Sequence, residues 1–323
     1  MRAIALDRFG GPGELRLQSV PIPTVDPHEV LVRLDVAGVG EWDPFEREGG
    51  YAAMMGLTPD FPYVLGSEGA GEVVAVGDAV EADGVQLGDR VFASGFLNPK
   101  GGFYADYAAV DADMVAPVPA GLTLEQAAVF GGVALTALRG LDDTLELKPG
   151  ESVVVVGASG GVGHMAVQLA RRLDARVLAV ASGPDGVDLA ERLGADAVVD
   201  GRAGAGVVAT AVADFAPDGV EAVLLTTGGE VADRVVAAVR EGGRVAYPTG
   251  VQPEPAERDG IDLRVYNGDP DPELLRRLVR LVERPADPPF QVEVFRELPL
   301  DGAAEAHQAL TQHHLGKLAL RIR

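Results

Sequence analysis

Cysteine is absent from this chain of 323 residues. Its absence excludes disulfides, thiolate zinc sites and thiol catalysis. No run of about 18 or more apolar residues occurs either, so we expect no membrane-spanning helix and no membrane partner. The first apolar run breaks off at Asp7 and does not form a signal-peptide core. Together these absences favour a cytoplasmic protein.

Positive charge is scarce too. Lys and Arg total 27 against 49 Asp and Glu, and lysine occurs only at positions 100, 148 and 317. The resulting net charge of −22 repels the backbones of nucleic acids, so we expect no nucleic-acid partner. With 47% hydrophobic residues, the chain is long enough for two domains with separate cores.

The first part of the chain has the pattern of antiparallel strands. Apolar and polar residues alternate with period two at 29–36, and similar short stretches follow at 71–77 and 89–93. From Thr123 the pattern changes, because a capping-box sequence ending at Gln126 predicts a helix over 124–141.

Strands and helices then alternate. This order is typical of parallel strands joined by right-handed crossovers, and it predicts a doubly wound parallel sheet. After a strand at 153–156, we expect strands at 176–181, 197–200, 219–226, 243–247 and 263–266, and helices at 187–193, 207–215 and 231–241. An amphipathic helix at 271–283 and a last strand at 318–322 close the chain.

The most specific local pattern is the glycine-rich turn that follows the strand at 153–156. Gly160 lets the backbone approach a phosphate, Gly163 lets the next helix pack close to the strand, and the helix N-terminus offers free amides. Ala158 replaces the first glycine of the G-x-G-x-x-G fingerprint. In this strand–turn–helix context the pattern predicts binding of a dinucleotide pyrophosphate. The turn consists of Ala158, Ser159, Gly160, Gly161, Val162 and Gly163.

Further motifs occur in a characteristic order at 38–43, 61–71, 88–91, 101–107, 134–138, 148–150, 242–245 and 316–321. In this order the chain resembles the medium-chain dehydrogenase/reductase superfamily, specifically its zinc-free quinone oxidoreductase and enoyl reductase branch. The resemblance implies an α/β fold in which a Rossmann doubly wound parallel sheet accompanies a GroES-like β-rich catalytic domain. It places the catalytic domain at 1–121, the Rossmann dinucleotide-binding domain at 122–267 and a C-terminal return to the catalytic domain at 268–323. It also implies an active site between the domains, and a homodimer that pairs the edge strand at 263–266.

Zinc-dependent relatives hold their catalytic metal with two cysteines and a histidine. The matching positions here are Gly40, Ser67 and Gly132, which make a poor ligand set, and the four-cysteine structural zinc loop is missing. His28, Asp43 and Glu68 are the alternative ligands, but acidic pairs on loops are usually solvated or hydrogen-bonded structure. We therefore expect no metal.

Without a Lewis acid, reduction of a quinone or an α,β-unsaturated carbonyl is easier than oxidation of a simple alcohol. By resemblance to enoyl reductases, Tyr51 is the candidate proton donor, although it equally fits an aromatic residue lining the cleft. Asp43 is expected to orient the neighbouring loop. Thr136 matches a residue that approaches the nicotinamide, unless it bonds back to its own helical turn.

Position 40 departs from the family pattern, because quinone reductases commonly carry Asn there. Gly40 removes a hydrogen-bond donor and opens space. Trp42, the only tryptophan, either narrows that space again or packs into the core of the β-rich domain, and we favour the core.

The cofactor choice depends on the end of the strand at 176–181. NAD sites usually place a carboxylate there, whereas this chain has Ser182, which can donate to a 2′-phosphate. The lysine and tyrosine of NADPH-dependent relatives align with Gly186 and Gly201, so the phosphate clamp is weaker. Arg202 remains as a possible cation, or as an ordinary surface arginine. We expect NADP(H) rather than NAD(H), with further cofactor contacts from Thr227, Gly228, Pro248, Thr249 and Gly250 at strand ends.

The sequence thus predicts a zinc-independent, NADPH-dependent reductase of a small-molecule quinone or enone. Gly40 and Trp42 leave open a tailoring reductase of a biosynthetic pathway with an unusual substrate. A non-catalytic NADPH-binding protein is the third hypothesis, because proteins that share a fold can differ in function.

Overall fold

The computed structural model describes residues 1–81, 84–269 and 271–323. The chain folds into two compact units. The β-rich unit contains residues 1–132, 271–276 and 292–323, and the sheet unit contains residues 133–269 and 277–291. The expected α/β class, with a parallel doubly wound sheet and a separate β-rich part, is confirmed.

The sheet unit is built on six strands in the order β11-β10-β9-β12-β13-β14, and every neighbouring pair is parallel. The chain enters this sheet at β9, adds β10 and β11 on one side, and then crosses back to add β12, β13 and β14 on the other. In sheets of this order, ligands usually bind at the carboxyl ends of the two central strands, here β9 and β12. The strands are β9 Ser152–Val156, β10 Arg176–Ala181, β11 Ala197–Asp200, β12 Val220–Leu225, β13 Val239–Pro248 and β14 Asp262–Tyr266.

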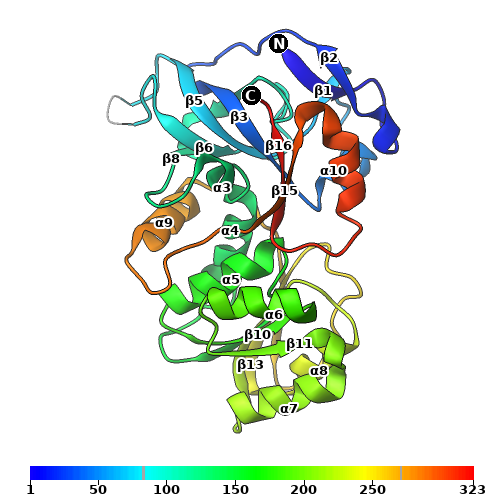
Figure 1. Ribbon diagram of the computed structural model, residues 1–323, viewed down its shortest axis with the longest axis vertical. Coiled ribbons are helices and arrows are strands. Elements are labelled where there is room, and N and C mark those ends of the chain that lie inside the picture. The colour runs from blue at the N-terminus through cyan, green and yellow to red at the C-terminus, as the bar shows by residue number, and fades with distance from the viewer. Residues whose placement is uncertain (82–83, 270) are drawn as a thin grey trace. The chain divides into compact units, whose positions relative to one another are not determined.

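Helices cover both faces of this sheet. α5 and α6 lie on one face and α7 and α8 on the other (Figure 1). The buried core between α7, α8 and the sheet consists mainly of valine and leucine, as expected for strands covered on both faces. The helices of this unit are α5 Gly161–Arg172, α6 Gly183–Arg192, α7 Ala205–Phe215 and α8 Glu230–Ala237. Two further helices, α4 Gly131–Leu138 and α9 Pro272–Glu283, each have residues in both units.

The β-rich unit contains two sheets. A small sheet has the order β2-β1-β4, and a larger one the order β15-β16-β3-β5-β6-β8, with β7 paired to β3. The strands are β1 Arg2–Leu6, β2 Arg16–Ser19, β3 Glu29–Val39, β4 Tyr63–Val64, β5 Glu68–Val76, β6 Arg90–Ser94, β7 Tyr107–Asp111, β8 Val115–Pro117, β15 Val294–Pro299 and β16 Lys317–Arg321. The last strand, β16, pairs antiparallel with β3, so the chain's end completes the sheet formed by its beginning.

Short helices complete the two units. They are α1 Asp43–Arg47, α2 Gly50–Met55, α3 Leu124–Ala128 and α10 Ala303–Ala309, with 3-10 turns η1 Pro12–Glu14, η2 Ala112–Met114, η4 Gly201–Ala203 and η5 Leu300–Gly302. No helix in the described ranges has both the length and the apolar character that crossing a bilayer requires.

The single helix expected over 124–141 is wrong. The capping box of Thr123 and Gln126 is present, but α3 ends at Ala128, α4 begins at Gly131, and residues Arg139–Thr144 form a π-helical segment, η3. The interruption is stabilised by tertiary contacts: Phe130 packs edge-on against Phe92, and Glu68 caps the new helix by accepting from the amide of Gly132 at 2.7 Å. The helix expected over 231–241 is also too long, because Val239 already belongs to β13 and pairs with Val220.

Candidate cofactor and substrate sites

The glycine-rich turn lies between β9 and α5 and is shaped by backbone contacts. A Cβ atom placed on Gly163 would lie 2.0 Å from the carbonyl oxygen of Gly157, so only glycine lets α5 start this close to the turn. The residue before α5, Gly160, supplies no side-chain cap. The first amides of α5 therefore carry the partial positive charge that attracts an anion.

Two buried side chains fix this turn. His164 donates from Nδ1 to the carbonyl oxygen of Gly160 at 2.8 Å, which turns its ring toward the turn itself. Ser159 is 3% exposed, and its hydroxyl accepts from the amide of Ser182 at 3.2 Å. The turn is thereby joined to the end of β10, which carries the residue expected to select the cofactor.

Ser182 and Arg202 are brought together at this point. Arg202 donates from Nε to the hydroxyl of Ser182 at 3.0 Å, although the two residues are 20 positions apart. Arg202 is therefore more than an isolated surface arginine. It supplies a cation beside a hydroxyl, a combination that suits a phosphate monoester.

Asp200 is a neighbouring carboxylate that sequence reasoning missed. One of its oxygens accepts from the amides of Gly183 and Arg202, both at 2.9 Å, and these bonds lower the pKa of Asp200. Its negative charge offsets part of the charge of Arg202. The available signal was an Asp followed by a glycine turn at the end of the strand next to β10.

The remaining predicted cofactor residues follow β12 and β13. Thr227 and Gly228 come after β12, and Pro248, Thr249 and Gly250 end or follow β13. Thr249 is held by its amide, which donates to Tyr266 O at 2.8 Å, and by its hydroxyl, which donates to Asn267 Oδ1 at 2.8 Å. Because carboxyl ends of parallel strands meet at one edge, these segments and the glycine-rich turn share that edge of the sheet.

Thr136 lies on α4 within the sheet unit and is 9% exposed. Its carbonyl oxygen accepts from the Tyr266 hydroxyl at 3.1 Å. A Cβ atom on Gly268 would lie 2.3 Å from the Thr136 hydroxyl, so the backbone after β14 passes directly against it. Asp43 and Tyr51 belong to the β-rich unit.

In the β-rich unit, the indole of Trp42 fills the space beside Gly40. A Cβ atom on Gly40 would lie 2.3 Å from the indole, and one on Gly132 would lie 3.2 Å from it. The indole nitrogen donates to the Ser67 hydroxyl at 2.7 Å. The expectation that Trp42 packs into the core is wrong: its ring occupies the volume that glycine at 40 leaves, next to all three positions where zinc-dependent relatives carry ligands.

A buried ion pair lies against the same indole. The Lys317 ammonium is 2.9 Å from Glu68 Oε1, donates to Val39 O at 2.8 Å, and lies 4.8 Å from the centre of the Trp42 ring. The side chains of Lys317 and Glu68 are 4% and 1% exposed. Glu68, one of the alternative metal ligands, is thus neutralised by a lysine.

The other two alternative ligands differ in burial: the side chain of His28 is exposed, whereas that of Asp43 is fully buried. Over residues 1–81, 84–269 and 271–323, the structure contains no cluster of three His, Cys, Asp or Glu side chains able to hold a metal ion.

Asp43 is the end of a directional chain of hydrogen bonds. One of its oxygens accepts from the amide of Gly40 at 2.8 Å and from the Tyr104 hydroxyl at 2.6 Å. His307 lies 3.1 Å from the Tyr104 oxygen through Nε2 and 3.0 Å from Arg47 through Nδ1. Since Arg47 can only donate and Tyr104 gives its proton to Asp43, the Nε2 atom of His307 carries the proton.

This chain holds the loop of residues 40–43 in place. Burial raises the pKa of Asp43 to about 6 and lowers that of His307 to about 3. Asp43 thus joins the loop backbone, through the amide of Gly40, to the buried side chain of Tyr104.

Tyr51 lies on α2 between two aromatic rings. Phe45 and Phe96 pack edge-on against it with ring centres 4.8 and 4.9 Å away. No residue in the described ranges accepts a hydrogen bond from its hydroxyl. Burial raises the pKa of Tyr51 above its ordinary value of 10.0, so the phenol keeps its proton at neutral pH.

Glu46 is a second buried acid that sequence reasoning missed. It is 5% exposed, and its Oε1 accepts from the Tyr63 hydroxyl at 2.6 Å. Burial, followed by the nearby charge of Asp43, raises the pKa of Glu46 to about 8. The only available signal was its position on α1, one helical turn after Asp43, which places both on one helix face.

Two family models match the chain. One, described as "Alcohol dehydrogenase GroES-like domain", matches residues 26–120, and the other, "Zinc-binding dehydrogenase", matches residues 161–265. The second match includes none of positions 40, 67 and 132.

Similar proteins extend over the whole chain. The quinone oxidoreductase of Mus musculus is 31% identical over 332 residues, covering 100% of this chain and 97% of that protein. The solved structure of an NAD-dependent alcohol dehydrogenase is 28% identical with a TM-score of 0.86, and that of a mycobacterial protein in complex with NADPH is 29% identical with a TM-score of 0.83. Each alignment covers 100% of both chains. The chain therefore belongs to the medium-chain dehydrogenase/reductase superfamily, as an oxidoreductase related to the quinone oxidoreductases.

Proposed function

We propose that the protein reduces quinones or α,β-unsaturated carbonyls with NADPH and without a metal. The observation that carries this proposal is the position of Trp42. Its indole fills the space beside Gly40 and Gly132 and binds Ser67, so the donor set of a catalytic zinc is replaced by an aromatic ring. Negative charge that develops during the reaction must then be stabilised by hydrogen bonds.

Activated alkenes and quinones suit such a site. When bound, the reduced nicotinamide supplies a hydride. The enolate or hydroquinone anion that results needs one donor and one proton. Tyr51 fits this role because its hydroxyl has no acceptor among the described residues and its raised pKa keeps it protonated. Phe45 and Phe96 restrict the ring, so the hydroxyl keeps one direction.

For the cofactor, the amides at the start of α5 would bind the pyrophosphate. Ser182 and Arg202 would bind the 2′-phosphate of NADP(H), and their hydrogen bond at 3.0 Å supports this assignment. Thr136, Thr227, Gly228 and the segment 248–250 would line the rest of the cofactor. Solved relatives of both cofactor types are similarly close, so the preference for NADPH rests on the Ser182–Arg202 pair.

The proposal is tested by following NADPH absorbance against a panel of quinones and enones, before and after treatment with a chelator. We expect oxidation of NADPH at an unchanged rate after chelation. Isothermal titration should give tighter binding for NADPH than for NADH. A clear NADH preference would contradict the cofactor assignment, and tight binding without oxidation by any acceptor would contradict the reductase activity.

A second candidate is a tailoring reductase of a biosynthetic pathway. It is favoured by the same tryptophan, because the indole takes the space that a side chain at position 40 would need, 2.3 Å from a Cβ atom on Gly40. Replacing it, as Trp42→Ala, should then broaden the range of enones reduced by the enzyme. A range that stays the same would indicate that Trp42 does not shape the substrate site.

We also propose a homodimer through β14. This strand is an edge of the parallel sheet, and Val265 on it is 57% exposed. Sedimentation equilibrium should give a dimer for the native chain and a monomer for Val265→Lys. A native monomer would contradict this proposal.

A further inference from the structure

Arg172, the last residue of α5, is a buried cation without an anion. It is 6% exposed, its Nε atom is buried without a hydrogen-bond partner, and no described residue accepts from its guanidinium. Arginine stays protonated in proteins, and a buried charge without a partner is strongly unfavourable. Two neighbouring arginines, by contrast, form ion pairs: Arg171 lies 2.5 Å from Asp196, and Arg284 lies 3.5 Å from Asp174.

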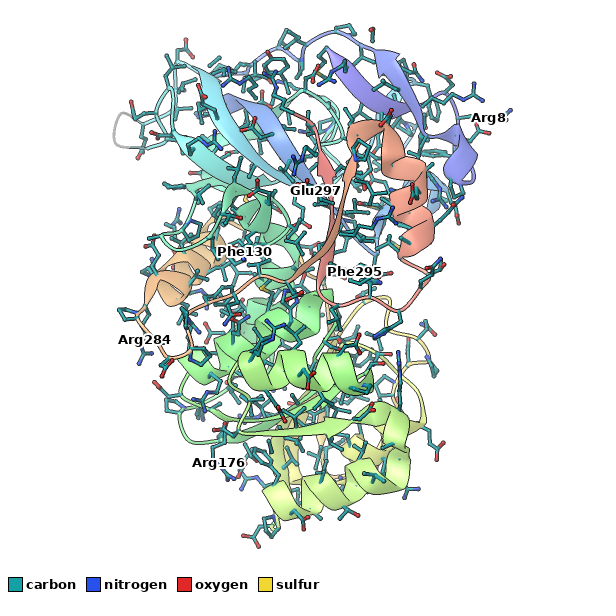
Figure 2. The ribbon with its side chains drawn as sticks, viewed as in Figure 1. Arg8, Phe130, Arg176, Arg284, Phe295 and Glu297 are labelled. Carbon is teal, nitrogen blue, oxygen red and sulfur yellow. The ribbon has the colours of Figure 1, made fainter. Side chains whose placement is uncertain are left out.

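Arg172 lines a cavity of about 230 Å³ in the sheet unit. The walls are the C-terminal end of α5, Leu193 at the end of α6, and the loop 284–288 that follows α9. Arg284 stands at the start of this loop (Figure 2). The glycine-rich turn is at the opposite end of α5, about 18 Å away for a helix of 12 residues.

The cavity is held open by contacts that need no ligand. Gln168, 1% exposed, donates to Gln291 O at 2.9 Å and accepts from Gln291 N at 2.8 Å, which fixes the end of the loop on α5. Arg284 donates to the carbonyl oxygen of Arg172 at 2.8 Å. The Arg172 guanidinium lies 5.0 Å from the centre of the Phe290 ring. A cation stacked on a ring keeps its N–H edge for in-plane acceptors.

A helix commonly ends in basic residues because they offset its dipole, and Arg171 does so from the surface. That explanation does not account for Arg172, whose buried guanidinium forms no ion pair with a carboxylate of the described residues. We propose that this cavity binds a small oxyanion, a carboxylate or a phosphate monoester, through the guanidinium of Arg172.

The charges and volume of the cavity restrict the ligand. Three arginines and two aspartates line it, and the carboxylates of Asp174 and Asp287 disfavour a polyanion. The volume is below the roughly 300 Å³ at which ordinary ligand pockets begin. A singly or doubly charged molecule of a few carbon atoms fits both limits, whereas a dinucleotide does not.

Isothermal titration with inorganic phosphate and, separately, with succinate tests the proposal at constant ionic strength. The wild type should bind at least one of them in a saturable way, and the preferred probe tells phosphate from carboxylate ligands. Arg172→Gln should weaken that binding about tenfold or more, because a charge-assisted bidentate contact is lost. The exposed helix residue Arg234 provides the matched control: Arg234→Gln should bind as the wild type does.

Arg202→Gln separates this cavity from the proposed cofactor site: saturable binding that persists in Arg202→Gln and is weakened in Arg172→Gln belongs to the cavity. Arg172→Lys, which keeps the charge, should weaken binding by a smaller factor and covers the case in which the glutamine variant does not fold. Absence of saturable binding in the wild type, loss of binding in Arg202→Gln alone, or unchanged binding in both Arg172 variants would overturn the proposal.

Discussion

The two units hold their functional groups in different ways. In the sheet unit, the candidate cofactor site consists mostly of backbone: glycines at a turn, helix amides and strand ends, with few buried charges nearby. In the β-rich unit, ionisable side chains are buried against one another, namely Asp43, Glu46, Arg47, Glu68, His307 and Lys317. A site made of backbone is disrupted when a substitution adds a side-chain atom to a glycine. A network of buried charges is disrupted when a substitution removes the partner of one charge.

The largest effect is expected from removing the partner of Glu68. Lys317→Met leaves the Glu68 carboxylate buried without its cation, and should lower the free energy of unfolding by about 3–5 kcal/mol. Lys148 is exposed, so Lys148→Met should change it little. The double variant Glu68→Gln/Lys317→Met should regain part of the loss. If chemical denaturation shows that Lys317→Met lowers the free energy of unfolding no more than Lys148→Met does, the buried ion pair of Lys317 with Glu68 does not stabilise the fold.

The second effect concerns pH. Burial raises the pKa of Glu46 from 4.5 to about 8, so the protonated acid belongs to the folded state. Its stabilising contribution is complete below about pH 4 and is lost as the pH rises through 8. Glu46→Gln keeps the acceptor for Tyr63 and should flatten this decline, by about 2–4 kcal/mol between pH 5 and 9.

Denaturation across this pH range checks the expected behaviour of Glu46. Glu191 is exposed, and Glu191→Gln should follow the wild-type curve. Equal slopes for the wild type and Glu46→Gln would show that Glu46 is ionised at neutral pH.

The third effect separates two glycines of the sheet unit. Gly163→Ala forces a methyl group to within 2.0 Å of a backbone oxygen and should cost about 2 kcal/mol of stability. The nearest atom to a Cβ on Gly160 is 3.5 Å away, so Gly160→Ala should keep stability within about 0.5 kcal/mol. It should still weaken NADPH binding, because the methyl group would lie where backbone approaches phosphate. Equal stability losses in the two variants would contradict this difference.

The smallest effect is expected at the cofactor phosphate. Arg202→Gln should raise the Kd for NADPH about tenfold, or about 1.4 kcal/mol, and leave the Kd for NADH unchanged. Arg234→Gln is the control, since this arginine is exposed on α8. Equal weakening for both cofactors would mean that Arg202 does not contact the 2′-phosphate.

The difference between the two units also explains which features the sequence could predict: those set by neighbouring residues, and not those set by residues far apart in the chain. Strands β10 and β11 begin and end where their patterns predict, because buried parallel strands and glycine turns are local features. Asp43, Tyr104 and His307 meet across separations of 61 and 203 positions, for which no local pattern exists. The sequence places Arg202 near the 2′-phosphate site but does not predict its hydrogen bond to Ser182. It also gives no role to the carboxylate of Asp200 beside this pair. The position of Trp42 required knowing that positions 40, 67 and 132 converge on one volume.

The central claim is a metal-independent reduction in which a protein hydroxyl supplies the proton. The most direct test is the rate of enone reduction by NADPH in Tyr51→Phe, because phenylalanine keeps the ring contacts with Phe45 and Phe96 and removes only the hydroxyl. Tyr107→Phe, on β7, is the matched control. We predict a fall of about 100-fold in kcat for Tyr51→Phe alone. An unchanged kcat would contradict the assignment of Tyr51 as the proton donor.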